Sequence, residues 1–268
     1  MKNRFSPTTL LFVFLTLTAL VLSACASGGT GGAGASTDAP DEAPTQSGGQ
    51  PANAPAGGDM TISKDILLDP ANATDADSLT VIESIYEGLF RVEGDQIVPV
   101  LAESYTAADD GLDYIIVLRS GLTFHDGSPV NADAVIANFN RWFDPEAAGH
   151  SGDFAAWASI FGGFKGETGD NNQPKSGFDG AEKVDEHTVL IHLTQPDNLF
   201  IAKLNNPAFS IVSPAAFSAD YFGTQLGAAA GTGPYKLSAW TDSGLTLEPN
   251  SSYWGGAVAT VMLEYLFK

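Results

Sequence analysis

The feature that most constrains the fold is the stretch at residues 121–145, "GLTFHDGSPVNADAVIANFNRWFDP", which joins a strand end, a tight turn and a capped helix. Asn131 is a residue type that caps helices, because its side chain accepts a hydrogen bond from the first turn. Apolar residues then recur at helical spacing, namely Val135, Ile136, Phe139, Trp142 and Phe143. The helix is predicted to end before Pro145. His125 and Asp126 are interpreted as turn-forming rather than catalytic residues.

Short strands and helices alternate along the rest of the chain from residue 59 onward. Period-two patterns and turn dipeptides such as Asp110-Gly111 predict hairpins. Strands are expected at residues 60–63, 114–119, 188–193, 235–240 and 245–248, with a final apolar strand near residue 268. Further helices are expected at residues 78–89, 153–161, 197–204 and 214–221. The pattern predicts a mixed α/β fold.

The chain is strongly acidic. Its 268 residues include 12 Lys and Arg against 32 Asp and Glu, a net charge of -20. Nucleic acid is excluded as a partner because binding it requires cations that neutralise phosphates. An anionic membrane surface is disfavoured for the same reason. Two interpretations of the acidity remain open, a solvated surface and a preference for cationic ligands.

The N-terminus carries a targeting pattern. Residues 1–24 combine Lys2 and Arg4 with an apolar run that ends in Leu-Ser-Ala before Cys25, the only cysteine. This junction resembles the lipobox of bacterial lipoproteins, so residues 1–24 are predicted to be a signal peptide and Cys25 to be lipidated. Two acyl chains would anchor the protein stably. The alternative is an ordinary secretory signal beside a chance cysteine.

Residues 25–58 follow as the lipidated cysteine and a tract of Gly, Ala, Ser, Thr and Pro without large apolar side chains. Such a composition buries too little apolar surface to offset the entropy of ordering, so it is predicted to be a disordered tether. Residues 59–268 are predicted to form the folded part, and the 44% hydrophobic residues of the chain suffice for its core.

Four sequence blocks, in order, resemble the family 5 extracytoplasmic solute-binding proteins, which are the peptide and nickel receptors of ABC importers. The blocks are "ESIYEGLFRVEGDQIVPVLAESY", "LTFHDGSPVNADAVIANFNR", "VDEHTVLIHLTQPDNLFIAKLNNPAFSIVSPAAF" and "GTGPYKLSAW" through "LEPNSSYWGG". The resemblance implies a periplasmic-binding-protein-like fold of the type II class. It also implies a receptor rather than an enzyme, which delivers an oligopeptide or dipeptide to an ABC permease and ATPase complex.

The resemblance implies an extracytoplasmic location and no cofactor. Members of this family are longer than this sequence, so residues 59–268 are expected to represent a truncated first lobe without the second lobe. A binding cleft needs both walls to bury most of a ligand. Residues 59–268 alone are therefore expected to bind ligand weakly or not at all.

The ligand-binding residues implied by the resemblance lie in two places. Thr74, Asp75 and Ala76 match a loop that lines the cleft in peptide-binding relatives, where it can contact an extended ligand. The alternative is an ordinary surface loop. Trp157 lies near an aromatic position that helps to bind peptide in relatives. Its alternative is core packing, since aromatic residues at helical spacing are usually buried.

Metal binding, serine hydrolysis and adhesion are the other functions to compare with the sequence. The sequence predicts no metal site, because its four histidines lack a spacing such as H-E-x-x-H. "GHSGD" around Ser151 nearly matches the nucleophile elbow of serine hydrolases, but Asp153 replaces the last glycine and a helix, not a strand, precedes it. An acidic surface lipoprotein with an adhesive role and no transport role is the remaining alternative, which capture of a permease would disfavour.

Overall fold

The structure is a computed structural model that describes residues 60–227, 229–258 and 262–268. The predicted signal peptide, the lipidated Cys25 and the tether lie outside these residues. The helices are α2 (Ala76–Ile85), α3 (Ala132–Phe143), α4 (Ala155–Phe161), α5 (Phe200–Lys203) and α6 (Pro214–Phe217), with a 3-10 turn at Pro207–Phe209. Among the described helices, none has the length and hydrophobicity that a membrane crossing requires.

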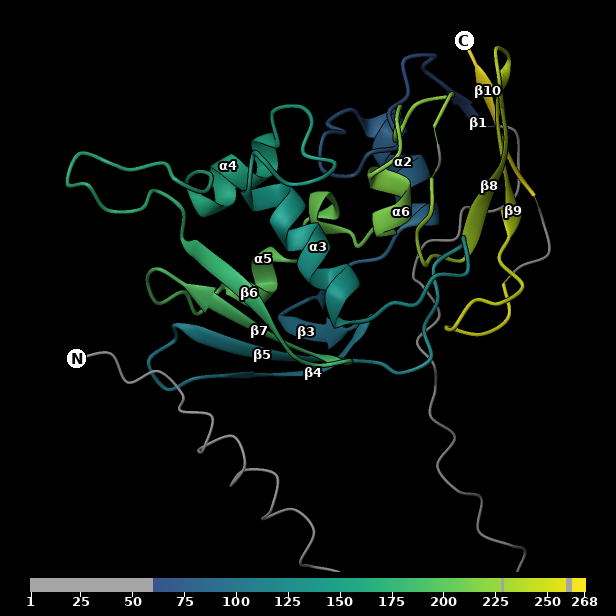
Figure 1. Cartoon of the computed structure of the whole chain (residues 1–268). Coiled ribbons are helices and arrows are strands. Elements are labelled where there is room, and N and C mark those ends of the chain that lie inside the picture. Colours follow the sequence, from purple (N-terminus) through teal and green to yellow (C-terminus); the bar gives the residue numbers. More distant parts are fainter. Residues whose placement is uncertain (1–59, 228, 259–261) are drawn as a thin grey trace, which may run out of the picture. The chain divides into compact units, whose positions relative to one another are not determined.

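The described strands form two four-stranded sheets and one separate hairpin (Figure 1). The first sheet has the order β4-β5-β7-β6, from β4 (Ala102–Ala107), β5 (Asp113–Leu118), β6 (Phe178–Asp185) and β7 (Thr188–Leu193). The second sheet has the order β1-β10-β9-β8, from β1 (Met60–Ile62), β8 (Tyr235–Thr241), β9 (Gly244–Pro249) and β10 (Leu263–Phe267). The separate hairpin pairs β2 (Phe90–Glu93) with β3 (Gln96–Pro99). The predicted mixed α/β composition and the predicted strands are confirmed.

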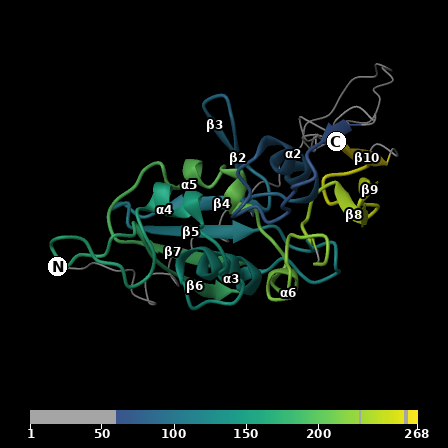
Figure 2. The same ribbon diagram turned by 90° about the horizontal axis from the view of Figure 1, so that it is seen from above.

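Pairing is antiparallel throughout both sheets except between β1 and β10, which run parallel with Met60 opposite Tyr265. The predicted hairpin with its turn at Asp110-Gly111 is β4–β5, and two further hairpins are β6–β7 and β8–β9. The two sheets stand apart in both views, with α3 packed on β6 and β7 and α2 near β8 (Figures 1 and 2). Each sheet therefore has its own helix cover.

Helix α3 begins and ends as the sequence predicts. The side chain of Asn131 accepts a hydrogen bond from the amide of Ala134 at 3.0 Å, and the helix ends at Phe143 before Asp144. Asp133 in the first turn and Arg141 in the last turn both suit the helix dipole.

Four predicted helices have different bounds, and α4 starts at Ala155 rather than residue 153. Helix α2 starts at Ala76 rather than residue 78, because the Asp75 side chain caps it, and it stops at Ile85 rather than residue 89. It stops there because the backbone of Glu87 pairs with Ile211 instead. The predictions for residues 197–204 and 214–221 shorten to one turn each, α5 and α6. Beyond α6, Tyr221 has a left-handed φ of 62°, which a helix cannot continue through.

The buried apolar residues form two separate cores. The first core packs α3 and α4 against the first sheet and includes Phe139, Trp142, Trp157 and Phe178. The second core fills the space under the second sheet and α2, and includes Ile82, Tyr235, Leu247 and Tyr265. The chain passes between the cores at residues 86–89 and again at residues 211–212. The amide of Ile211 donates to the carbonyl of Glu87 at 2.9 Å, which joins the two crossings.

The Glu87 carboxylate lies at this junction and accepts three hydrogen bonds. Thr232 Oγ1 and Trp254 Nε1 donate to Oε2 at 2.8 and 2.7 Å, and the Tyr253 hydroxyl donates to Oε1 at 2.7 Å. Burial raises the pKa of Glu87 above its ordinary value, because these neutral donors offset only part of the lost hydration. The junction is thus held by a carboxylate that binds its proton more tightly than an exposed one does.

Glu87→Gln tests this with a pH series. The stability that protonated Glu87 contributes is fully present below its unfolded pKa, near 4.5, and is lost as pH rises through the raised folded pKa. The free energy of unfolding of Glu87→Gln, minus that of the parent chain, should therefore increase with pH in urea titrations between pH 4 and 8. The exposed Glu83→Gln, also a removal of one carboxylate, is the matched control against which the pH series is compared. A flat difference for Glu87→Gln would contradict the assignment.

Candidate ligand-binding site

A cavity of about 580 Å³ opens where three loops meet. The loop between β1 and α2 and the loop before α4 form its main walls, and the loop after α6 completes it. Its lining residues are Leu67, Asp69, Ala71, Asn72, Ala73, Thr74, Ser151, Gly152, Asp153, Phe154, Ala155, Ala156, Phe222 and Thr224. Loops held by a rigid scaffold are the usual location of binding residues.

A buried ion pair lies behind the cavity. Arg141 Nη2 of α3 donates to Asp69 Oδ2 at 2.6 Å, and the two side chains are 0% and 4% exposed. Arg141 Nε donates to the carbonyl of Gly149 at 2.8 Å. The guanidinium carbon also lies 5.1 to 5.3 Å from the centres of three rings, those of Phe154, Phe217 and Phe222. Buried charges require such pairing, and the aromatic faces add a favourable electrostatic contact.

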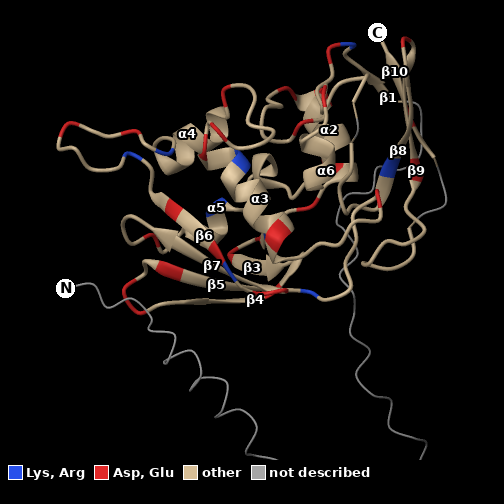
Figure 3. Ribbon diagram, viewed as in Figure 1, with Lys and Arg blue, Asp and Glu red and all other residues tan. Residues whose placement is uncertain are grey.

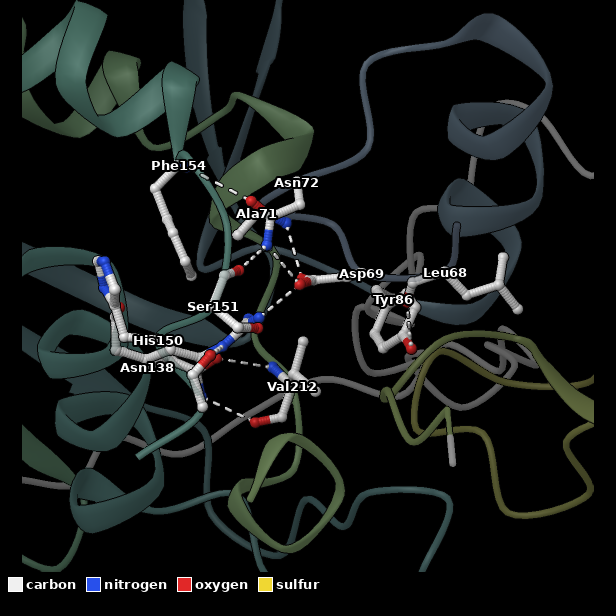
Figure 4. A network of polar contacts seen from close by, with 12 residues as sticks. Leu68, Asp69, Ala71, Asn72, Tyr86, Asn138, His150, Ser151, Phe154 and Val212 are labelled. Carbon is white, nitrogen blue, oxygen red and sulfur yellow. Dashed lines mark hydrogen bonds and ion pairs between the residues drawn. The ribbon is translucent and has the colours of Figure 1, made fainter. Parts of the chain in front are cut away.

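Asn72 connects the two main walls of the cavity (Figure 4). Its Nδ2 donates to Asp69 Oδ2 and to the carbonyl of Ser151, both at 2.7 Å. Its Oδ1 accepts from the amide of Phe154 at 3.3 Å. The amide of Ala71 donates to Asp69 Oδ1 at 3.1 Å. One carboxylate and one amide side chain therefore fix both loops to each other and to α3.

The loop before α4 carries backbone strain. Phe154 has φ 42° and ψ 46°, a left-handed conformation that costs a non-glycine residue about 1–3 kcal/mol. The ring of His150 stacks on Phe154 with 4.4 Å between centroids, and His150 Nδ1 lies 2.7 Å from the carbonyl of Arg141. At Gly152, with φ 102°, an added Cβ would lie 2.4 Å from Asn72 Oδ1. Packing on both sides therefore holds a strained segment at the cavity wall.

Of the sequence-predicted site residues, the structure places Thr74 at this cavity, and Asp75 and Ala76 follow it in the chain. Thr74 is exposed and lines it directly. Asp75 is the N-cap of α2 and accepts from the amide of Ser78 at 2.8 Å. Burial opposes ionisation of Asp75, but the hydrogen bonds from Ser78 outweigh it, so the pKa of Asp75 is lowered. Ala76 is the first residue of α2. Asp75 and Ala76 thus set the direction in which the Thr74 segment enters the helix.

Trp157 lies elsewhere. It is 1% exposed, and its Nε1 donates to the carbonyl of Gly163 at 3.1 Å. Its ring packs in the first core against Trp142, Phe143, Phe161, Phe178 and Phe209. Trp157 therefore packs in the core, which was the alternative interpretation of this residue. A contact between Trp157 and ligand stays a prediction.

The residues considered for catalysis have structural contacts. His125 Nε2 lies 2.9 Å from the carbonyl of Gly233, and Asp126 accepts from Ser128 and Ser213. Ser151 follows α3 and a turn rather than a strand, so it does not occupy a strand-to-helix elbow. Within the described residues, no three His, Cys, Asp or Glu side chains are grouped as metal ligands.

Sequence reasoning missed the residues that hold the site. Asn138 and Arg141 are polar, but both belong to the buried side of α3. Asn138 Nδ2 donates to the carbonyl of Val212 at 2.8 Å, and Oδ1 accepts from the amide of Val212 at 3.1 Å. Polar residues that fall inside an apolar stripe are the available signal, because a buried polar group must have a partner. The identity of each partner is not encoded in that pattern.

Comparison with known proteins identifies the family. The family model for "Bacterial extracellular solute-binding proteins, family 5 Middle" matches residues 96–267. This chain belongs to family 5 of the bacterial extracellular solute-binding proteins. The predicted resemblance is therefore confirmed, and the matched relatives are binding proteins rather than enzymes.

Individual relatives agree with this assignment. The glutathione-binding protein GsiB of Escherichia coli O1:K1 is 37% identical over 190 residues, which are 70% of this chain and 33% of that protein. The structure of the ABC transporter-associated periplasmic binding protein DppA from Helicobacter pylori with the peptide STSA superposes with a TM-score of 0.62, at 26% identity, over 79% of this chain and 41% of that one. The nickel ABC transporter structure from Bacillus halodurans gives a TM-score of 0.59 at 28% identity, over 78% of this chain and 38% of that one.

The chain thus spans about a third of the length of the curated relative and about two-fifths of the solved ones. The predicted periplasmic-binding-protein-like α/β fold is confirmed, and a coverage near two-fifths corresponds to one lobe of such a protein.

Arg141→Met should destabilise the chain by about 3–5 kcal/mol, because it leaves the buried Asp69 carboxylate without its cation. Urea unfolding measures the loss. Arg91→Met is the matched control, since Arg91 pairs with Glu93 at the surface with side chains 33% and 52% exposed, and should cost at most about 1 kcal/mol. Adding Asp69→Asn to Arg141→Met should recover part of the loss. Equal losses in the two arginine variants would show that the buried pair is not needed.

Proposed function

We propose that this chain captures an extracytoplasmic solute, a short peptide, for delivery to the permease and ATPase of an ABC importer. Family membership supports the class of function. The main structural support for a binding site is the cavity lined by Thr74, which lies in a loop fixed by Asp69 and Asn72. Peptide is favoured as the ligand because one structural neighbour was solved with a peptide and the curated relatives bind glutathione, itself a tripeptide.

The proposed contacts come from the loop that enters α2. Thr74 offers a hydroxyl at the cavity, and the backbone at Asp75 and Ala76 continues this edge. An extended ligand can bond to such a segment through main-chain groups, which gives affinity with little dependence on side chains. The alternative of an adhesive surface lipoprotein is not favoured, because the matched relatives are solute-binding proteins.

Titration with short peptides tests the proposal. Alanine tripeptide and glutathione, added separately at millimolar concentration, should shift the amide resonances of Thr74, Gly152 and Ala155. Thr74→Trp should abolish these shifts because the indole would fill the cavity mouth. Thr106→Trp, on the exposed edge strand β4, is the matched control and should leave them unchanged. The proposal fails if no cavity amide responds to either peptide, or if Thr74→Trp responds as the parent chain does.

We further propose that Cys25 carries a lipid that anchors the chain to the cell membrane, so that the protein lies in the periplasm or at the outer face of the cytoplasmic membrane. Cys25→Ser should move the protein from the membrane fraction to the soluble extracytoplasmic fraction and abolish labelling with an alkyne fatty acid. Ser27→Ala, two residues away, should change neither result. Continued membrane attachment of Cys25→Ser would rule out the anchor, and release of the parent chain would favour the ordinary secretory signal.

A further inference from the structure

We propose that the cavity receives a cationic group of the ligand, with Asp153 as its counter-charge, so that basic peptides are preferred over acidic ones. This inference rests on the proposed peptide-binding function. Of the charged residue types, the cavity lining contains two carboxylates, Asp69 and Asp153, and neither Lys nor Arg. The electrostatic character of the cavity therefore depends on whether each carboxylate is already neutralised.

The charge of Asp69 is already matched. Its carboxylate contacts the Arg141 guanidinium at 2.6 Å and accepts two further hydrogen bonds, from Ala71 and Asn72. The side chain of Asp69 is only 4% exposed. A ligand thus meets an ion pair that is neutral as a unit, and the Asp69 carboxylate in it already accepts three contacts.

Asp153 is different. It is exposed at the cavity, and within the described part of the chain its carboxylate has no ion pair or side-chain hydrogen bond. Arg141, which contacts the lining residues Asp69 and Phe154, is 0% exposed and is committed to Asp69. The cavity therefore carries one unmatched negative charge that is available to a ligand.

Three residues that carry hydroxyl groups also line the cavity, Thr74, Ser151 and Thr224, and the Thr224 hydroxyl donates to the carbonyl of Tyr221 at 2.8 Å. A hydroxyl oxygen can accept a hydrogen bond, and an ammonium group has three donors and no acceptor. The attraction of Asp153 for a cation is that of a solvent-accessible carboxylate, because its side chain is exposed at the cavity. One carboxylate with several neutral acceptors is a suitable environment for an ammonium or guanidinium group.

The surrounding charge acts in the same direction. Acidic residues are spread over the loops, α3 and the strands of both sheets, while Lys and Arg are few (Figure 3). The net charge of the chain is -20. Such a field raises the local concentration of cations and opposes the approach of anions. Glutathione, with two carboxylates and one ammonium, is accordingly expected to bind more weakly than a basic tripeptide.

A charge series of tripeptides tests this preference. Ala-Lys-Ala, Ala-Ala-Ala and Ala-Glu-Ala are titrated against the chain at low salt, and the dissociation constants are obtained from the cavity amide shifts. Ala-Lys-Ala should bind about threefold to fivefold more tightly than Ala-Glu-Ala, the range of a solvent-accessible charge pair. Raising the ionic strength to about 1 M should reduce the ratio, since the Debye length falls to about 3 Å.

Asp153→Asn should bring the Lys-to-Glu ratio close to one. Asp109→Asn removes the same charge from the exposed turn between β4 and β5 and should retain the ratio, which separates a local effect from a change in net charge. Equal binding of all three peptides, or an unchanged ratio in Asp153→Asn, would overturn the charge preference and leave the peptide-binding function intact. Absence of binding by all three peptides would overturn both proposals.

Discussion

The ion pair between Arg141 and Asp69 holds the two halves of the described fold together. Arg141 extends from α3, which packs in the first core, and its guanidinium contacts Phe154 of that core and Phe217 of the second. Asp69 belongs to the loop that leads into α2 and the second core. Neither charge could remain buried without the other, because the lost hydration would cost several kcal/mol. The requirement to pair therefore fixes where the two cores meet.

Asn72 depends on that pair and defines the cavity. Because Asp69 is held in place, its carboxylate can orient Asn72, whose amide then binds both the Ser151 carbonyl and the Phe154 amide. The left-handed Phe154 and the tight approach at Gly152 persist because this network specifies their positions. The carboxylates at the two junctions differ in chemistry. Asp69 faces a cation, whereas Glu87 is bonded only to neutral donors and has a raised pKa.

The sequence predicts the local elements well because their signals are local. Asn131 identifies the start of α3 within the chain itself, and period-two patterns locate β5 and β7. The helices predicted at residues 197–204 and 214–221 are longer than α5 and α6, and the left-handed φ of Tyr221 at the end of the second range has no sequence signature. Within the candidate site, Thr74 was found through a family resemblance. The partners of Arg141 and Asn72 could not be predicted from the sequence. Pairing between distant loops depends on tertiary packing, which residue spacing does not encode. Trp157 shows the converse case, in which an aromatic residue flagged for ligand contact lies in the core.

The parallel pairing of β1 with β10 imposes an order on the folding of the two sheets. The strands of the first sheet all lie between Ala102 and Leu193, so their hairpins can form as soon as that part of the chain has emerged. The second sheet cannot be completed until later, because Met60 of β1 pairs with Tyr265 of β10 near the other end of the described chain. Until then β1 is a short apolar strand with no partner on that side, and contacts between such distant segments form slowly. The topology therefore allows an intermediate in which the first sheet is complete while the edge of the second sheet is still open.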